Sequence, residues 1–465
     1  MRKNVVLAVL ALLLAGMIAL LVARPREPYT APREIVESRE AGVDAAPSGS
    51  ASASASAAPT PPPVVDAASV VKPLLDRPLR VSAAGWELLA PGVADDKPSP
   101  ELTIELASAE WPEIAQARLA RGGADPQGAD IALVPLPELV LGYERLRALD
   151  PRVFHVVGFS RGREELRALA KDGKPEPEVR VGAWDAAGRA LALFVLGGQG
   201  VPLEKVRFLA PSVPEAKGAP WMAQLWNEPA EAGYRTVLST AEASRLVPLC
   251  AVAARSSVEK NEPAFRRWVD RWQAGIGRVK ADAPEIARLV AQRQGAPDAA
   301  SVVDRLGRVE LVDAATVASL LGATERAPMT IESLFALYWQ LFRAAAVVTA
   351  PPPATPPVVA TFVTPQAAPR PDAGTARVTG DAGAPVGAAV FVFKIPEGKL
   401  DERALATHVA LTSAVFDRFV VRVSGKNARA VVADAHARHA VEAQVFAGSA
   451  PVPAQTALVL EIVPR

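Results

Sequence analysis

The segment HVVGFSRGREEL, residues 155–166, holds a G-x-S-x-G pattern centred on Ser160. An apolar, strand-like run precedes the pattern, and a helix-like run follows it. In hydrolases this arrangement is a tight turn that presents a serine nucleophile at the end of a strand. A serine at the same place can also cap a helix, so catalysis and capping are the two chemistries to separate.

A serine nucleophile needs a general base that removes its proton, and the usual base is a histidine. The chain has four histidines, and His155 lies on the strand that leads into the pattern, five residues before Ser160. From that position it cannot reach the serine from across the sheet. The others belong to a separate C-terminal segment: His408, His436 and His439. We therefore predict that the protein is not an enzyme and uses no cofactor, and we keep hydrolysis as the weakest alternative.

Candidate metal ligands are few. His436 and His439 lie three residues apart on a predicted helix, but no third ligand accompanies them, so we predict a solvated helix face and no metal site. The single cysteine, Cys250, rules out an internal disulfide framework and a zinc site built on cysteines. Its apolar surroundings, LVPLCAVAA, predict a buried side chain.

A helix capped by Ser160 would direct its free backbone N–H groups and the side chain of Arg161 at one place, which suits an anion or a polar ligand. Comparable junctions after other strand-like runs bring in Trp86, Trp184, Asp185, Ser239 and Thr240. In open α/β sheets several strand ends converge on one ligand-binding crevice. Capping without a ligand stays open for Ser160 taken alone.

Residues 5–23 form an apolar run without charges, and basic residues flank it on both sides. About 19 residues that rise about 1.5 Å each nearly span a bilayer core of about 30 Å. A cleaved secretory signal is the alternative, but LVA before Arg24 is a poor cleavage site. We predict a cytoplasmic stub at residues 1–4 and a transmembrane anchor at residues 5–23, which hold a periplasmic protein at the inner membrane.

Two tracts poor in large apolar residues divide the rest of the chain. Residues 24–75 include SGSASASASAAPTPPPVV, and residues 347–385 are rich in proline. Such compositions favour disordered or extended linkers over a packed core. The tracts separate a middle domain, residues 76–346, from a C-terminal unit, residues 386–465. The formal net charge of +1 gives no reason to expect nucleic acid as a partner.

The middle domain alternates short apolar runs, such as ADIALVPL at residues 129–136, with helix-like segments. This alternation predicts an α/β architecture with mainly parallel sheets covered by helices. The segment PAFRRWVDRWQAGIGRV places Trp268 and Trp272 on one face at helical spacing, so we expect both in the core.

The C-terminal unit reads strand, helix, strand, helix, strand, strand, from AAVFVFK at residue 388 to TALVLEIVP near the end. This order predicts a small open sheet with two helices on one face. Asp401 and Asn427 immediately precede the two helices, and we predict that each caps its helix.

With these residues in view, the middle domain resembles the periplasmic solute-binding proteins of ABC transporters, in particular the two-lobed group similar to nitrate, sulfonate and taurine binders. The resemblance rests on the ordered segments LRVSAAGWELLAPG, GADIALVPLPELV, DPRVFHVVGFSRGREEL, VRVGAWDAAGRALALFVLGGQG and LSTAEASRLVPLCAVAARSS. It implies two α/β lobes that close on a small solute, with an ABC permease as partner. By position, it assigns to the ligand loops Trp86, Ser160, Arg161, Trp184, Asp185, Ser239 and Thr240. The segment VADDKPSP departs from the family, so the first ligand loop is expected to be remodelled.

The C-terminal unit resembles a degenerate OmpA-like peptidoglycan-binding domain through VFVFKIPEGKLDERALATHV, RFVVRVSG and the final helix and strands. In that family an aspartate after the second strand and an arginine in the next helix grip diaminopimelate of the wall peptide. Here Gly425 runs almost directly into Asn427 and the aspartate is missing, while Arg429 matches the arginine. An arginine alone can hold a carboxylate but not an ammonium group, which weakens the implied contact with peptidoglycan.

Two functions follow from these observations. The leading prediction is a membrane-anchored, exported solute-binding protein that captures a small anionic solute and touches the cell wall with its tail. The alternative is a structural scaffold that binds no solute and bridges the membrane and peptidoglycan through its long linkers.

Overall fold

The computed structural model describes residues 72–95, 99–169, 179–183, 185–210, 212–216, 219–225, 228, 232–363, 387–398 and 400–465. The predicted stub and anchor at residues 1–23 lie outside this range, as does Trp184. Among the helices within it, none is long and apolar enough to cross a membrane. The anchor therefore stays a prediction from the sequence.

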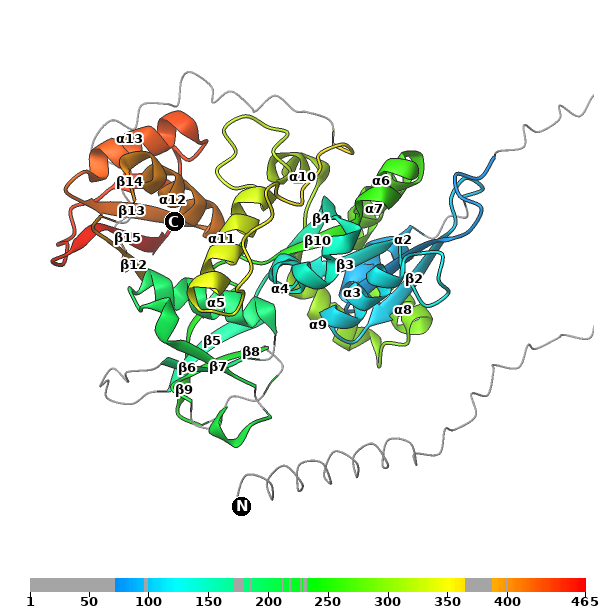
Figure 1. Cartoon of the computed structure of the whole chain (residues 1–465), viewed down its shortest axis with the longest axis horizontal. Helices are drawn as coiled ribbons and strands as arrows, with labels where there is room; N and C mark the ends of the chain where they lie inside the picture. Colours follow the sequence, from blue (N-terminus) through cyan, green and yellow to red (C-terminus); the bar gives the residue numbers. More distant parts are fainter. Residues whose placement is uncertain are drawn as a thin grey trace, which may run out of the picture. The chain divides into compact units, whose positions relative to one another are not determined.

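Six strands form the sheet of the first lobe, in the order β11-β4-β10-β3-β1-β2 (Figure 1). They are β1 (Leu79–Ala84), β2 (Ile104–Ala109), β3 (Ile131–Pro135), β4 (Pro151–Ser160), β10 (Pro248–Ala254) and β11 (Val309–Leu311). Strand β1 pairs in parallel with β2 and β3, but β10 runs antiparallel to both β3 and β4. The predicted mainly parallel arrangement is therefore wrong for this sheet. The chain first builds the second lobe, and β10 then returns between β3 and β4 in the direction opposite to both.

Helices cover both faces of this sheet, because its central strands carry apolar side chains on both faces. Successive side chains of a strand point to opposite faces. In β3, Ile131 and Leu133 join one buried cluster, and Ala132 and Val134 join the other. The helices of the first lobe are α2 (Ala90–Ala94), α3 (Pro112–Arg121), α4 (Leu136–Leu146), α6 (Arg255–Lys260), α7 (Glu262–Ala281), α8 (Ala283–Gln294), α9 (Ala299–Gly307) and α10 (Ala314–Leu320), with short 3-10 turns at Glu87–Leu89 and Arg147–Leu149.

Helix α7 confirms two core predictions. Trp268 and Trp272 are buried, and their rings stack with centroids 4.7 Å apart.

His155 on β4 lies against Trp268, and its Nε2 is 3.1 Å from Nε2 of Gln273. Burial lowers the pKa of His155 to about 3, so the ring is neutral at physiological pH. Cys250 on β10 is buried as predicted.

The second lobe has a five-stranded sheet in the order β7-β6-β8-β5-β9. Its elements are β5 (Glu164–Leu169), β6 (Val179–Ala183), α5 (Ala186–Gly198), β7 (Val206–Leu209), β8 (Trp221–Leu225) and β9 (Tyr234–Ser239), with 3-10 turns at Leu203–Lys205 and Pro214–Ala216. Strand β5 pairs antiparallel with β8 and β9, whereas β6 pairs in parallel with β7 and β8. Helix α5 is apolar over most of its surface and packs against β5 and β8.

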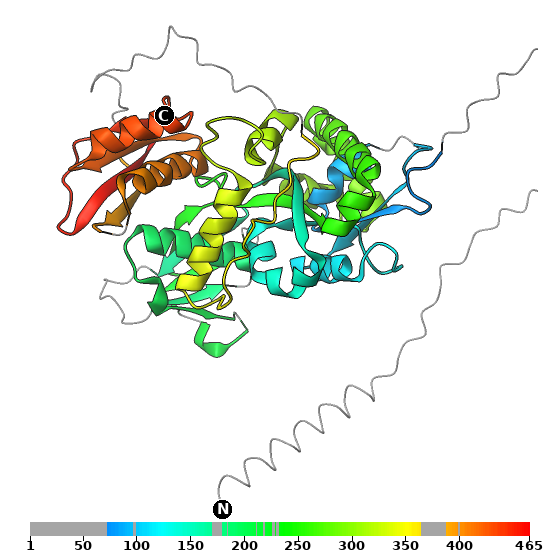
Figure 2. The ribbon, with the colours of Figure 1, turned by 45° about the horizontal axis from the view of Figure 1, so that its top comes forward.

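The chain crosses between the two lobes twice. It leaves the first lobe at residues 161–163 and returns at residues 240–247, between β9 and β10. Helix α11 (Ile331–Ala344) then packs against α4 of the first lobe and α5 of the second (Figure 2). The two-lobed α/β fold expected from the sequence is thus present in the topology itself.

Part of the second proline-rich tract packs on the first lobe. The backbone N–H of Val153 on β4 donates to the carbonyl of Pro357, at 2.7 Å, and Val153 and Val358 form an isolated parallel bridge. Phe362 is buried against Phe154 and Phe265. Residues 347–363 therefore extend the folded body beyond the predicted boundary at residue 346.

The C-terminal unit folds in the predicted order. Its elements are β12 (Phe391–Pro396), α12 (Glu402–Val415), β13 (Phe419–Gly425), α13 (Ala428–Arg438), β14 (Val445–Ala447) and β15 (Thr456–Pro464), and its sheet order is β12-β15-β13-β14. Asp401 caps α12 by accepting from the backbone N–H of Ala404, at 2.7 Å. The predicted cap at Asn427 is wrong, because its backbone is turn-like and its side chain makes no capping bond.

Candidate functional site

The G-x-S-x-G pattern lies at the first crossover between the lobes. Ser160 ends β4, the backbone turns at Gly162 with φ of +78°, and β5 begins at Glu164. Ser160 therefore caps no helix, and the predicted helix N-terminus beside Arg161 does not exist. The segment after the turn forms a strand because β8 and β9 pair with it on both sides.

Thr240 joins the two crossovers. Its buried hydroxyl oxygen accepts from the backbone N–H groups of Gly162 at 2.8 Å, Arg163 at 3.1 Å and Glu164 at 3.3 Å. The same hydroxyl donates to a carboxylate oxygen of Glu164, at 3.0 Å. The backbone N–H of Thr240 donates to the carbonyl of Glu164, at 3.0 Å. The predicted helix after Ser239 and Thr240 is absent, since residues 240–247 form turns that lead into β10.

Ser160 is fully buried in the same network. Its hydroxyl donates to the carboxylate of Glu164, and its backbone N–H donates to the carbonyl of Val247, at 2.9 Å. A serine nucleophile needs an exposed hydroxyl and a base within reach. Here the hydroxyl is covered, and His155 faces α7, so the structure gives the pattern a role in holding the crossovers together.

A buried ion pair joins the end of β1 to the first crossover. Nη1 of Arg163 lies 2.7 Å from Oε1 of Glu87, which is fully buried in the turn after β1. Arg305 on α9 adds a second cation, with Nη1 3.8 Å from the other Glu87 oxygen, and its guanidinium lies 5.0 Å from the ring centroid of Trp86. Gly85 is required here, because a Cβ at this residue would lie 2.5 Å from the Glu87 carboxylate.

Two further carboxylates meet at the N-terminus of α5. Asp185 caps this helix by accepting from the backbone N–H of Gly188, at 2.7 Å, which confirms the predicted junction of strand and helix. Glu138, at the start of α4, accepts from the backbone N–H of Ala186, at 2.6 Å. Burial, with help from the negative charge of Asp185, raises the pKa of Glu138 to about 8. Burial also raises the pKa of Asp185 and that of Glu164.

The predicted ligand residues differ in accessibility. Ser160 and Thr240 are fully buried, and Ser239 is buried against Glu242, to which its hydroxyl donates at 2.5 Å. Trp86 and Asp185 are half-buried and Arg161 is exposed. Their contact with a ligand stays a prediction.

Four charged residues that the sequence pattern does not single out lie where the two lobes meet, namely Glu87, Glu138, Arg163 and Glu164. Each lies within a few residues of a strand end, next to buried apolar positions. A search for charged residues directly after strand-like runs would have found them. Their burial, however, depends on which strands meet in space, and the sequence pattern does not supply that information.

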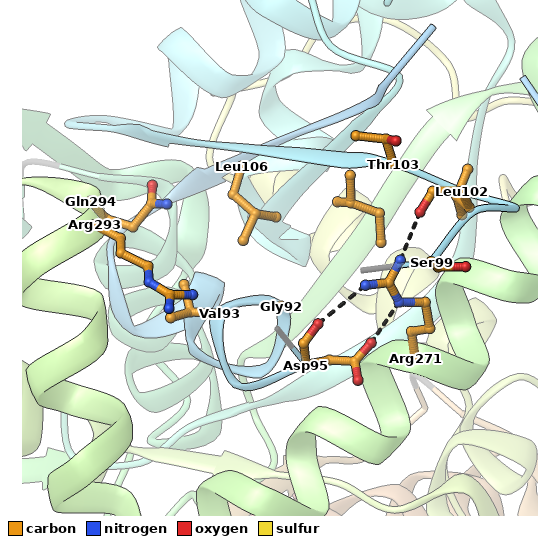
Figure 3. Close-up of a pocket in the computed structure, with 11 residues that line it drawn as sticks. Gly92, Val93, Asp95, Ser99, Leu102, Thr103, Leu106, Arg271, Arg293 and Gln294 are labelled. Atoms are coloured by element: carbon orange, nitrogen blue, oxygen red, sulfur yellow. Dashed lines mark hydrogen bonds and ion pairs between the residues drawn. The ribbon is translucent and has the colours of Figure 1, made fainter. Parts of the chain in front are cut away.

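Two cavities of the described residues lie elsewhere on the first lobe. One of about 390 Å³ is lined by parts of α2, β2, α7 and α8 (Figure 3). Its main charges pair with each other, since Nε of Arg271 lies 2.5 Å from the carboxylate of Asp95 and Nη1 donates to the carbonyl of Leu102, at 2.8 Å. Neither this cavity nor a second one of about 700 Å³ is lined by any predicted ligand residue.

Several solved structures similar to the chain are described as periplasmic solute-binding proteins. The aliphatic sulphonate binding protein SsuA from Escherichia coli is 15% identical, with a TM-score of 0.41, over 58% of this chain and 88% of that one. The alkanesulfonate-binding protein SsuA from Xanthomonas axonopodis pv. citri, solved bound to MOPS, is 14% identical, with a TM-score of 0.41, over 58% and 93%. A sulfonate-binding SsuA described as putative, from Methylobacillus flagellatus, is 11% identical, with a TM-score of 0.42, over 63% and 98%. No protein-family model and no curated protein matches the chain.

Replacing Thr240 by Val should lower the free energy of unfolding by at least about 1–3 kcal/mol, which is the cost of one buried N–H group without an acceptor, because the N–H groups of Gly162, Arg163 and Glu164 all lose this oxygen. The control, Thr240→Ser, keeps the hydroxyl and should retain most of the stability. Urea denaturation of both variants and the parent measures the difference. A Val variant as stable as the parent, beside a destabilised Ser variant, would show that the methyl group matters and the hydroxyl does not.

Glu138 should make the protein less stable as pH rises. Its pKa is about 8 when folded and about 4.5 in its ordinary state, so between these values the folded state holds a proton that the unfolded state has released. Stability is then lost with increasing pH, by up to about 1.4 kcal/mol per pH unit. Glu138→Gln should flatten the dependence of melting temperature on pH in this window, whereas Glu204→Gln, at an exposed residue away from the N-terminus of α5, should not. Parallel curves for both variants and the parent would contradict this assignment.

Proposed function

We propose that the chain is an exported solute-binding protein whose two lobes hold a small solute at their junction. The observation that carries this proposal is the double crossover, which brings together polar residues from the ends of β1, β4, β6 and β9. Trp86, Arg161 and Asp185 retain exposed surface there and are the proposed ligand contacts. Trp184 and Ser239 are proposed on sequence position.

The charge of the solute follows from the ionic groups at the junction. Arg163 is the mostly buried cation suited to an anion, and Glu87 already pairs with it. An anionic solute therefore has to replace the Glu87 carboxylate at Arg163, or bind through the exposed Arg161. The nearby carboxyl groups of Glu138 and Asp185 have raised pKa values, so protonation can reduce their repulsion toward an anion.

The proposed setting of this protein rests on its sequence. The apolar run at residues 5–23 supports an inner-membrane anchor with the folded domains in the periplasm, and an ABC permease is the proposed partner that receives the solute. No permease contact is assigned to any surface.

The proposed role of the tail is contact with peptidoglycan. Arg429 is exposed in the first turn of α13, directly after β13, where the resemblance to OmpA-like domains places the wall-binding arginine. A guanidinium at this position can donate hydrogen bonds to a carboxylate of the wall peptide.

A scaffold that binds no solute is the second candidate, and one observation favours it. Most polar groups at the junction pair with one another: Glu87 pairs with Arg163, and Glu164 accepts from Ser160 and Thr240, while Oε2 of Glu87 has no hydrogen-bond partner among the described residues. A junction that has internal partners for its buried groups needs no solute to complete it.

A thermal-shift screen of the full-length protein separates the two candidates. Nitrate, phosphate, sulfonates and amino acids are the probes, and a ligand present at a hundredfold its Kd adds about 2.7 kcal/mol of stability. We expect an anion to raise the melting temperature, and to raise it more in Glu87→Gln, where Arg163 has lost a competing carboxylate. Glu105→Gln removes an exposed carboxylate paired with Arg80 and is the matched control. No shift with any probe in the parent or in Glu87→Gln would support the scaffold.

Sedimentation with purified peptidoglycan tests the tail. The parent protein should pellet with the wall, and Arg429→Ala should lose most of this binding because the guanidinium is the proposed carboxylate partner. Arg403→Ala changes an exposed arginine on the other helix, α12, and should pellet like the parent. Equal pelleting of both variants would remove Arg429 from the site, and no pelleting of the parent would reject wall binding.

A further inference from the structure

The C-terminal domain, residues 387–465, contacts the two-lobed domain at three places, and together these form what we call the docking face. Its first contact is with α5 of the second lobe. The ring of Phe194 lies 5.2 Å from that of Phe393 and 6.3 Å from that of Phe416. The fit is close, because a Cβ added to Gly198 would lie 2.1 Å from the Phe393 ring.

The second contact is with the return crossover itself. The backbone N–H of Arg245 donates to the carbonyl of Val415, at 3.2 Å, and the hydroxyl of Ser244 donates to the carboxylate of Asp417. Nε of Arg245 lies 3.1 Å from the same carboxylate. Ser244 is fully buried, so the end of α12 covers the crossover at this point.

The third contact is with the first lobe. Glu310 on β11 lies 3.6 Å from Nη2 of Arg418 and 3.8 Å from Nη2 of Arg245. Arg326, in the turn after α10, forms an ion pair with Glu442 in the C-terminal domain. The docking face therefore touches both lobes and one of the segments about which they would rotate.

We propose that the docked C-terminal domain is an intramolecular clamp that fixes the angle between the two lobes, and that its release frees the lobes to rotate about the crossovers. A rigid body in contact with both lobes cannot stay docked while one lobe turns against the other, because either the Phe194 contact or the Glu310 and Arg326 pairs must break. The clamp then favours one lobe angle among those the crossovers permit.

A consequence for binding rests on the proposed function. If a solute prefers one lobe angle, clamp docking and solute binding change each other's free energy by the same amount. A partner of the C-terminal domain that competes for the docking face would then change solute affinity. The clamp itself requires no solute, so its test stands apart from the screen for ligands.

The test measures two distances by pulsed electron paramagnetic resonance in the full-length protein without any added solute. Spin labels on Ala117→Cys and Lys205→Cys report the distance between lobes, and labels on Lys205→Cys and Glu402→Cys report docking. All three positions are exposed, and the native Cys250 is buried. Arg245→Glu reverses a charge at the docking face, and Arg245→Glu with Asp417→Arg restores an opposite pair.

We expect a single narrow distribution for both distances in the parent protein. Arg245→Glu should lose both narrow distributions, and the double variant should regain them. A docking distance that broadens while the distance between lobes stays narrow would overturn the clamp, since α11 would then suffice to hold the lobes. A broad docking distance in the parent would overturn it as well.

Adjacent glycines give a second pair of variants that does not depend on charge. Gly198→Val intrudes on Phe393, whereas Gly197 has Leu203 as its nearest neighbour, at 3.6 Å from an added Cβ. Both variants place a valine in the last turn of α5, so any effect of valine on the helix itself is the same in both. A difference between the two variants then reports the contact with Phe393. Gly198→Val should broaden both distances and Gly197→Val neither. If the docking distance stays narrow in both Arg245→Glu and Gly198→Val, these contacts do not hold the domain and the proposal fails.

Discussion

The two lobes of this protein meet where the chain crosses between them, and one buried hydroxyl ties the crossings together. Thr240 on the return crossover accepts from three successive backbone N–H groups of the outgoing one. Buried N–H groups without an acceptor are costly, so this turn is stable only while the return segment lies beside it. The paired crossovers in turn bring the ends of β1, β4, β6 and β9 to one junction, and every candidate ligand residue depends on that convergence.

The sequence predicts strands best where burial is continuous. Strands β3, β4 and β10 are buried along their length and mostly apolar because helices cover both faces of their sheet, and such runs stand out in the chain. Strand β5 was mistaken for a helix because Glu, Leu, Arg and Ala favour helices on their own. Its pairing with β8 and β9, which come more than fifty residues later, overrides that preference. A pattern confined to neighbouring residues cannot contain this pairing.

The same limit applies to the candidate site. The sequence pattern correctly places Trp86, Ser160, Asp185 and Thr240 at or near strand ends. It also predicts that Ser160 faces a ligand, whereas in the fold this side chain is fully buried. The charged residues Glu87 and Arg163 are 76 residues apart and form their buried pair across the first crossover. A charged side chain read from sequence is normally assigned to solvent, and only the topology shows that these two face each other inside the protein.

The junction's internal ion pair determines how strongly any anionic solute could be held. Breaking a buried pair by removing one partner leaves an uncompensated charge, which is strongly unfavourable. A solute that displaces Glu87 from Arg163 must therefore supply an equivalent carboxylate-like group and leave Glu87 with a new partner or a proton. Arg305 lies 3.8 Å from the free oxygen of Glu87 and is placed to become that partner. Exchange of Glu87 between Arg163 and Arg305 would let the site open without leaving a buried charge unpaired, and it would couple α9 of the first lobe to the occupancy of the crossover.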